Sequence, residues 1–331
     1  MRGFYRKPTG RIVTQLALHL FTACAGLALL LATDSPLLAA VGMALFSAGQ
    51  IGVATNTHTS AHYATSHRRW VNRALTYLGY PLFMGLGATY WWHKHNVRHH
   101  GSPNVIEIDE DAQLRPWFAF TQADVRAAGP LLRFYYRVQW VLLPAIALMG
   151  LQLQLNSLRH LGRVVWSRQR FGLVHWLDLG MLALYWGLWV GVPLLFLPVA
   201  SVLIFTVLRL VIVSVALFSI FSPAHVPAEA SAVQHAMRGS DPVRLQTATT
   251  LNFRTGWLGR WLISGLQHQI EHHLFPGISH VHYPAMSPLL ASYCARHGYP
   301  YRTLGWGEAL WKTLGNFLRP KDLDTSLAEP A

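Results

Sequence analysis

Histidines gather in three short clusters whose spacing suits metal binding. The last cluster lies in residues 267–276, which read Q-H-Q-I-E-H-H-L-F-P. Histidine is the commonest side-chain ligand for transition metals. The clustered histidines are His58 and His62, then His95, His99 and His100, then His268, His272 and His273. The sequence therefore predicts a metal site assembled from three separate segments.

Each cluster contains two histidines four residues apart, and two clusters also contain an adjacent pair. On a helix, residues four apart present both imidazoles on one face. Adjacent histidines point about 100° apart, because a helix has about 3.6 residues per turn. An adjacent pair is thus poorly placed to close on one ion and well placed to serve two neighbouring ions. The two His-His pairs indicate a two-metal site.

An acidic run follows the second cluster and comprises Glu107, Asp109, Glu110 and Asp111. Such a run is typical of a solvated loop. Its carboxylates could also accept the ring N–H groups of metal-bound histidines and so fix their orientation. The sequence leaves both interpretations open.

The composition is that of an integral membrane protein. Of 331 residues, 52% are hydrophobic and only 12% are charged, whereas an average soluble domain is roughly a quarter charged. No polar linker divides the chain, so we expect one domain over residues 1–331. Cys24 and Cys294 are the only cysteines, too few for an iron–sulfur cluster or a Cys-type zinc site.

The net charge of +13 points to anionic partners. The basic residues flank apolar runs and form no separate basic domain. We therefore expect membrane lipid headgroups, an acidic redox partner or a phosphate-bearing acyl carrier, and no nucleic acid.

Four apolar stretches are long enough to cross a bilayer, which takes about 20 residues. They are residues 12–33, 37–56, 176–197 and 200–221. Two further apolar segments contain Gly and Pro. We expect 74–92 to be a bent helix near the membrane interface, and 131–155 to be an interfacial or re-entrant segment. Arg209 falls inside the fourth stretch, where a charge needs a partner; Asp178 is a candidate. From residue 319 to 331 we expect a disordered tail.

The basic residues also predict the topology. The amino terminus, the 57–175 loop and the region after 222 carry nearly all Lys and Arg, and the two short turns carry none. Positive residues stay cytoplasmic, so both termini and the histidine clusters are expected there. The expected fold is all-α, with four transmembrane helices in two hairpins and a cytosolic helical cap that carries the metal site. The absence of a signal peptide and of a fused domain favours a bacterial inner membrane.

Six motifs give the chain a family resemblance. They are H-T-S-A-H at 58–62, K-H-N-V-R-H-H at 94–100, A-H-V at 224–226, T-T-L-N-F at 249–253, Q-I-E-H-H-L-F-P at 269–276 and I-S-H-V-H-Y-P at 278–284. From about Gln50 to Pro284, the sequence resembles the membrane fatty acid desaturases, and most closely their front-end branch. The resemblance implies O₂-dependent desaturation of a fatty acyl chain by two iron ions.

The resemblance also implies the ligand set, with no catalytic residue beyond the metal ligands. The implied ligands are His58, His62, His95, His99, His100, His225, His272 and His273. Candidates for direct metal contact or for supporting the ligands are His268, Gln269, Glu271 and Asn252. Gln269 stands where the front-end branch replaces the first histidine of its third box. Thr59 departs from the branch, which usually has Asp at that position.

Several partners follow from the same resemblance. The acyl substrate is expected on CoA, on a carrier protein or on a lipid, with O₂ as co-substrate. The haem motif H-P-G-G of a fused cytochrome b5 is absent, so we expect electrons from a separate ferredoxin or cytochrome b5.

Three other functions stay open. A hydroxylase, or a fatty acid decarboxylase that makes a terminal alkene, would use the same histidines on the same scaffold. A membrane metal transporter would place metal ligands inside the spans, whereas these clusters lie at span ends and beyond. A zinc-dependent membrane hydrolase would hold zinc in place of iron.

Overall fold

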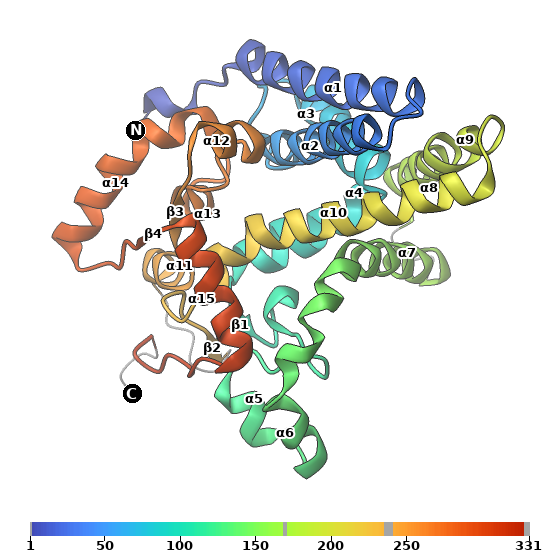
Figure 1. The fold of residues 1–331 in the computed structure, drawn as a ribbon. Coiled ribbons are helices and arrows are strands. Elements are labelled where there is room, and N and C mark those ends of the chain that lie inside the picture. Colours follow the sequence, from blue (N-terminus) through green and yellow to red (C-terminus); the bar gives the residue numbers. More distant parts are fainter. Residues whose placement is uncertain (1, 168–170, 235–240, 328–331) are drawn as a thin grey trace. The chain divides into compact units, whose positions relative to one another are not determined.

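The computed structural model describes residues 2–167, 171–234 and 241–327, which are mostly helical (Figure 1). By its contacts the chain divides into two compact units, and the expectation of one domain over residues 1–331 stays a prediction. Unit 1 comprises the residues up to His93, then Ala147–Leu217 and Trp261–Ser264. Unit 2 comprises Lys94–Ile146, Phe218–Arg260 and the residues from Gly265 onward.

Unit 1 is built from long apolar helices and a few short ones. Its elements are η1 (Arg2–Tyr5), α1 (Thr9–Leu31), α2 (Pro36–Ala61), α3 (Arg69–Tyr77), η2 (Leu78–Met84), α4 (Ala88–Trp91), α7 (Met149–Ser167), α8 (Leu173–Trp186), η6 (Gly187–Gly191), α9 (Val192–Leu194) and most of α10 (Val199–His225).

Helices α1 and α2 pack as a close hairpin, side by side in Figure 1. A Cβ atom added at Gly26 would lie 2.3 Å from the backbone nitrogen of Phe46, and one added at Gly49 would lie 2.3 Å from that of Ala23. Small residues let two apolar helices approach this closely, and van der Waals packing then holds them together. The turn between them carries no Lys or Arg.

The segment 74–92 is a bent helix, as we expected from its glycines and proline. It is divided among α3, the π-helical η2 and α4. The break lies at Gly85, whose φ is +66°, a conformation open to glycine at little cost. The side-chain amide of Gln50 on α2 donates to the carbonyl oxygen of Phe83 at 2.6 Å and so pairs a polar group at the bend.

Five helices among the described residues are long and apolar enough to cross a membrane. They are Thr9–Leu31, Pro36–Ala61, Gln139–Ser167, Leu173–Leu194 and Val199–His225. Four of them agree with the predicted spans to within a few residues. The fifth overlaps the segment that we placed at the interface, and its first part is the 3₁₀ helix η5 (Gln139–Leu148), which contains Pro144. The expected number of four spans is therefore not confirmed.

Arg209 is buried within unit 1, and the suggested partner Asp178 is wrong. Its guanidinium donates to the hydroxyl of Tyr185 and lies 5.3 Å from the ring of Trp189. Asp178 instead accepts from the backbone nitrogen atoms of Ala88, at 2.7 Å, and Thr89, at 2.9 Å. Aromatic faces and one hydroxyl, in place of a carboxylate, surround this cation.

Unit 2 consists of short elements joined by loops. They are most of η3 (Trp92–His99), β1 (Val105–Ile106), η4 (Glu110–Ala112), α5 (Gln122–Ala127), α6 (Pro130–Tyr136), most of η5, β2 (Val233–Gln234), α11 (Pro242–Thr249), β3 (Asn252–Arg254), most of α12 (Trp257–Ile263), α13 (Gln269–Leu274), η8 (His280–His282), α14 (Tyr283–His297), β4 (Thr303–Gly305) and α15 (Trp306–Leu318).

Two short parallel ladders modify the all-α expectation. Strand β1 pairs with β2, and β3 pairs with β4. Neither ladder is long enough to form a sheet with its own core. Each ladder pairs two chain segments that lie far apart in sequence. Strand β1 follows the second histidine cluster along the chain, and β3 precedes the third.

The carboxyl-terminal segment is ordered as far as Leu327, so the expected disorder is wrong for this part. Leu323 forms a β-bridge with Ala232, and the side chain of Asp324 accepts from the hydroxyl of Ser231 at 2.7 Å. Lys321 is buried. Residues 328–331 lie outside the described residues.

Candidate metal centre

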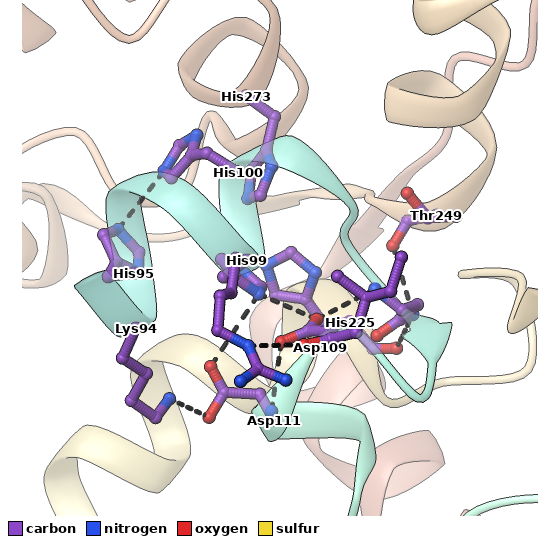
Figure 2. A network of polar contacts seen from close by, with 12 residues as sticks. Lys94, His95, His99, His100, Asp109, Asp111, His225, Thr249 and His273 are labelled. Atoms are coloured by element: carbon purple, nitrogen blue, oxygen red, sulfur yellow. Dashed lines mark hydrogen bonds and ion pairs between the residues drawn. The ribbon is translucent and has the colours of Figure 1, made fainter. Parts of the chain in front are cut away.

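Two histidines of the second cluster, His95 and His99, lie on η3, and His100 directly follows it. Element η3 is a π-helix and not the α-helix that the spacing suggested. Hydrogen bonds in a π-helix run between residues five apart. His95 and His100, five apart, accordingly approach to 3.2 Å between their Nε2 atoms. His99 faces elsewhere, toward Asp109 and His225 (Figure 2). The π-helix thus separates the histidines of this cluster into two directions.

Three histidines from three segments of unit 2 form one group. They are His99 on η3, His225 at the last residue of α10 and His273 on α13. One ring nitrogen of each lies within 4.8 Å of those of the other two, and all three residues are buried. This separation allows all three to reach a common ion.

A second set lies beside the first. The rings of His95 and His272 stack with centroids 6.2 Å apart, and those of His100 and His272 meet edge-on at 4.6 Å. The 3.2 Å between the Nε2 atoms of His95 and His100 is close to the roughly 3 Å expected for neighbouring ligands at about 2.1 Å from one ion.

The adjacent histidines diverge as expected. The rings of His99 and His100 lie at 90° to each other, and those of His272 and His273 at 84°. Within unit 2, His273 groups with His99 while His272 has a ring nitrogen within 4.8 Å of one of His95. Each pair therefore contributes one ring to each set.

Side chains outside the clusters orient these rings. Nδ1 of His99 donates to Asp109 at 2.9 Å, and Nδ1 of His273 lies 3.1 Å from Oε1 of Gln246. The amide of Gln246 is itself oriented, because its Nε2 donates to the carbonyl oxygen of His100 at 2.7 Å. A histidine whose Nδ1 is bonded in this way binds metal through Nε2.

His272 has a comparable partner in Tyr283, whose hydroxyl oxygen lies 3.2 Å from its Nδ1. Both side chains are buried. Burial raises the pKa of the Tyr283 hydroxyl above its ordinary value, and the nearby Glu271 adds to the effect. The hydroxyl thus stays protonated and remains a hydrogen-bonding partner for His272.

Asp109 is 1% exposed, so the acidic run is more than a solvated loop. Burial by itself lowers the pKa of His99, but the carboxylate of Asp109 outweighs burial and raises it. Burial would raise the pKa of Asp109, yet His99 and the backbone N–H of Asn104 bring it well below its usual range. The carboxylate is therefore ionised and available to hold His99.

A buried cluster of polar side chains stabilises helix α13. Glu271 accepts from the side-chain amide of Asn252 at 2.8 Å and from the hydroxyl of Tyr301. The carbonyl oxygen of Asn252 accepts from the backbone nitrogen of Ile270 at 2.9 Å. Asn252 and Glu271 thus bond to each other, and they support the helix that carries His272 and His273.

The two other candidates lie at the start of the same helix. His268 is the residue before α13, outside its helical turns, and its Nδ1 lies 2.9 Å from the hydroxyl of Ser287. It is not part of the histidine groups found among the described residues. Gln269 is buried beside His225, and its amide donates to the carbonyl oxygen of Leu266 at 2.9 Å.

The first cluster lies in unit 1. His58 is in the last turn of α2 and His62 directly follows the helix, as the sequence predicted. Their ring centroids are 4.9 Å apart, and the ring of Trp91 lies 5.9 Å from that of His58. The four-residue spacing thus brings two imidazoles together at the end of a candidate span.

The residues present fit a transition metal. Six buried imidazoles in unit 2 offer ring nitrogens of the kind that iron, zinc and copper accept as ligands. Neither ring nitrogen of His225 has a hydrogen bond of normal geometry within the described part of the chain. A buried polar atom of this kind needs a partner, and a metal ion is a suitable one.

The chain matches the family model described as "Fatty acid desaturase" over residues 34–305. The chain belongs to the fatty acid desaturase family. Among known members, Delta(8)-fatty-acid desaturase 2 of Arabidopsis thaliana is 29% identical over 281 residues, which cover 78% of this chain and 59% of that protein. Acyl-lipid (8-3)-desaturase of Thraustochytrium sp. is 28% identical over 273 residues, covering 78% and 58%.

A bacterial desaturase is also similar. The sn-1 linoleoyl-lipid 6-desaturase of Synechocystis sp. is 28% identical over 262 residues, which cover 74% of this chain and 69% of that protein. The chain spans less than two thirds of the length of the first two relatives. Family membership therefore rests on the shared domain, which contains all eight expected ligands.

Sequence reasoning missed three residues of this site. Gln246 and Tyr283 touch His273 and His272, and the ammonium group of Lys94 pairs with Asp111 beside His99. Tyr283 lies in the family-like stretch 278–284 and Lys94 in the second histidine motif, so a signal existed for both. Gln246 lies outside the motifs, and only the fold brings it to His273.

Proposed function

We propose that this protein desaturates a fatty acyl chain, with O₂ as oxidant and two histidine-bound iron ions as cofactor. The observation that supports this most strongly is the convergence of six buried histidines from three segments of unit 2, in a chain that belongs to the desaturase family. We further propose that His58 and His62 supply the remaining ligands.

The net reaction removes one hydrogen from each of two adjacent methylene carbons and leaves a double bond. O₂ takes up these two hydrogens with two electrons and two protons from an external donor, and it leaves as two waters. When bound, the two irons would supply this oxidising chemistry. Imidazole ligands also suit zinc and copper, so the choice of iron rests on the family and not on the ligand type.

The protein's own part is to hold the ligands rigidly. Asp109 and Gln246 keep the Nδ1 atoms of His99 and His273 bonded, which leaves Nε2 as the ligand atom of each ring. Burial of these groups excludes water and strengthens their electrostatic interactions. The position and orientation of the acyl chain relative to the metals would select the carbon pair.

The substrate is proposed to be an acyl chain on a membrane lipid. Two of the similar proteins carry names that specify acyl-lipid or linoleoyl-lipid substrates. Their names specify different positions on the chain, so the product must be identified directly. If new double bonds appeared in acyl-CoA before they appeared in glycerolipids during a short labelling pulse, the lipid-linked substrate would be wrong.

The deciding test is a fatty acid and hydrocarbon profile of cells that express the chain with a ferredoxin or cytochrome b5. We expect a new double bond with the intact protein and none with His272→Ala. His297→Ala, which changes an exposed histidine on α14, is the matched control and should leave the product unchanged.

Other products would revise the proposal in defined ways. A hydroxylated acid or a terminal alkene would keep the metal centre and replace the reaction. No new product, together with zinc in the purified protein, would remove the oxygenase assignment altogether. Two irons per intact chain, and fewer in His58→Ala, would support the inclusion of the first cluster.

A further inference from the structure

The backbone carbonyl oxygen at His225 receives two hydrogen bonds from distant parts of unit 2. Nδ2 of Asn104 donates to it at 2.7 Å, and Nζ of Lys321 donates to it at 3.0 Å. The last carbonyls of a helix have no partner within the helix, and His225 is the last residue of α10. These two side chains therefore fix the helix end that carries a proposed ligand.

Lys321 makes contacts that account for all three of its N–H groups. Besides His225, its ammonium group donates to the carbonyl oxygens of Pro227, at 3.1 Å, and Ala230, at 2.6 Å. The ring of Phe120 lies 4.5 Å away, a distance suited to a cation–π contact. Lys321 thus binds the backbone of the whole turn that follows His225.

This lysine is 6% exposed, and burial lowers its pKa well below the ordinary value. A buried ammonium group is costly unless it is well paired, and a cation at the carboxyl end of a helix is favourable. The carbonyl oxygens and the aromatic ring offset the cost of burial. The position therefore suits a side chain that offers several hydrogen-bond donors from one nitrogen.

The same network reaches a second ligand of the group. Oδ2 of Asp109 accepts both from Nδ1 of His99 and from the backbone nitrogen of Asn104, each at 2.9 Å. Asn104 then bonds the carbonyl oxygen at His225. A continuous chain of hydrogen bonds therefore runs from His99 through Asp109 and Asn104 to His225 and Lys321.

We propose that Lys321 is a positioning residue, which holds His225 in the orientation needed to bind metal with His99 and His273. Lys321 lies beyond residues 34–305, the part of the chain that matches the family model. The inference rests on the proposed metal role of His225. It assigns to the carboxyl-terminal segment a function in the site.

The test uses the full chain in detergent and measures Fe²⁺ affinity by competition with a chromogenic chelator. Lys321→Met removes the donors and keeps most of the side-chain volume. We expect it to weaken binding of iron about 10- to 100-fold, as loss of a ligand-supporting contact typically does, and to change the Mössbauer spectrum of the bound iron. Lys312→Met is the control, because Lys312 contacts the same turn only through the side chain of Glu229.

A double-mutant cycle with His225→Ala separates positioning from general stability. If Lys321 acts through His225, Lys321→Met causes little further loss of affinity in the His225→Ala background. An equal loss in both backgrounds, or wild-type affinity and spectrum in Lys321→Met, would overturn the inference. Should Lys321→Met fail to fold, Lys321→Arg carries the same cycle, since it keeps the cation but cannot match three converging carbonyls.

The outcome for His225→Ala alone tests the underlying assignment. Unchanged iron binding in that variant would remove the metal role of His225, and with it the positioning role. Weakened binding in His225→Ala, together with normal binding in Lys321→Met, would overturn only the inference about Lys321.

Discussion

At the scale of single residues, the carboxylate of Asp109 supports two neighbours of the metal site at once. It accepts from His99 and from the backbone of Asn104, and it is buried. Such partners fix the orientation of a ligating imidazole and increase its basicity. In the acidic run after the second cluster, Asp109 is thus the buried carboxylate that bonds His99 directly, and Asp111 lies 3.7 Å from the same ring nitrogen.

Asp109→Asn tests this role. The new amide either points its NH₂ group at the N–H groups of His99 and Asn104, or accepts from them with an oxygen that carries no negative charge. In both cases the support for His99 is weaker, so we expect Fe²⁺ affinity to fall about 10- to 100-fold. Glu110→Gln is the control, because Glu110 pairs at the surface with Arg98 at 3.4 Å. Equal affinities in the two variants, measured by chelator competition, would show that Asp109 does not support the site.

Asp241 is the N-cap of α11, the helix that carries Gln246. Its carboxylate accepts from the backbone nitrogen atoms of Val243, at 2.9 Å, and Arg244, at 3.1 Å. Asp241→Ala should lower the free energy of unfolding by about 1 kcal/mol, measured by chemical or thermal unfolding in detergent. Asp241→Asn keeps a capping oxygen, so its free energy of unfolding should fall much less. An equal fall in both variants would rule out loss of the cap as the cause.

The same cap predicts a pH dependence. Burial alone would raise the pKa of Asp241, but the N–H of Arg244 and the hydroxyl of Tyr299 outweigh it and lower the pKa below its ordinary 3.8. Its contribution to stability is therefore fully present above about pH 4 and is lost as pH falls through the folded-state value. The difference in melting temperature between wild type and Asp241→Ala should shrink over that range.

At the scale of elements, the α1–α2 hairpin depends on glycines at the contact. A Cβ atom at Gly49 would meet backbone atoms of α1 at 2.3 Å, and backbone cannot move aside as a side chain can. We expect Gly49→Ala to destabilise unit 1 by about 1–3 kcal/mol, the usual cost of overpacking. Gly180→Ala on α8 is the control, since nothing lies within 4 Å of the added atom.

Thermal unfolding of both variants in the same detergent measures the difference. Gly180→Ala should be neutral or slightly stabilising, because alanine favours a helix more than glycine does. A melting temperature for Gly49→Ala equal to that of the control would mean that the two helices can separate without cost. The close hairpin would then not be a determinant of stability.

At the scale of the whole molecule, the distribution of positive charge predicts the number of membrane crossings. Five helices qualify by length and composition. If Gln139–Ser167 crossed the bilayer, the arginines before it, such as Arg133 and Arg137, and those after it, Arg168 and Arg170, would lie on opposite sides. That arrangement conflicts with the preference of positive residues for the cytoplasmic side.

We therefore predict four crossings, with both termini on the cytoplasmic side of the membrane. Fusions of green fluorescent protein and of alkaline phosphatase to each end of the chain measure this directly. Fluorescence with no phosphatase activity is expected at both ends. Phosphatase activity at one end only would indicate an odd number of crossings and favour the fifth helix as a span.

The sequence by itself indicated the family, which the family match confirms, and it predicted four spans and the residue types of the proposed metal site. Apolar length is a local property, and histidines at fixed spacing show their chemistry without a fold. Divergence of adjacent histidines was also predictable, because it follows from helix geometry alone. The separation of His99 from His100 and of His272 from His273 confirms it.

Only the tertiary structure decided which distant side chains support the ligands. The π-helix that pairs His95 with His100 breaks the four-residue spacing on which sequence reasoning relied. Gln246 and Lys321 lie far in sequence from the histidines that they support, and Asn104 closely follows the second cluster but bonds to His225, 121 residues later. These hydrogen bonds depend on how the chain folds back. The order of the tail has the same cause: Lys321 is polar by type, and three carbonyl oxygens that only the fold assembles allow it to be buried.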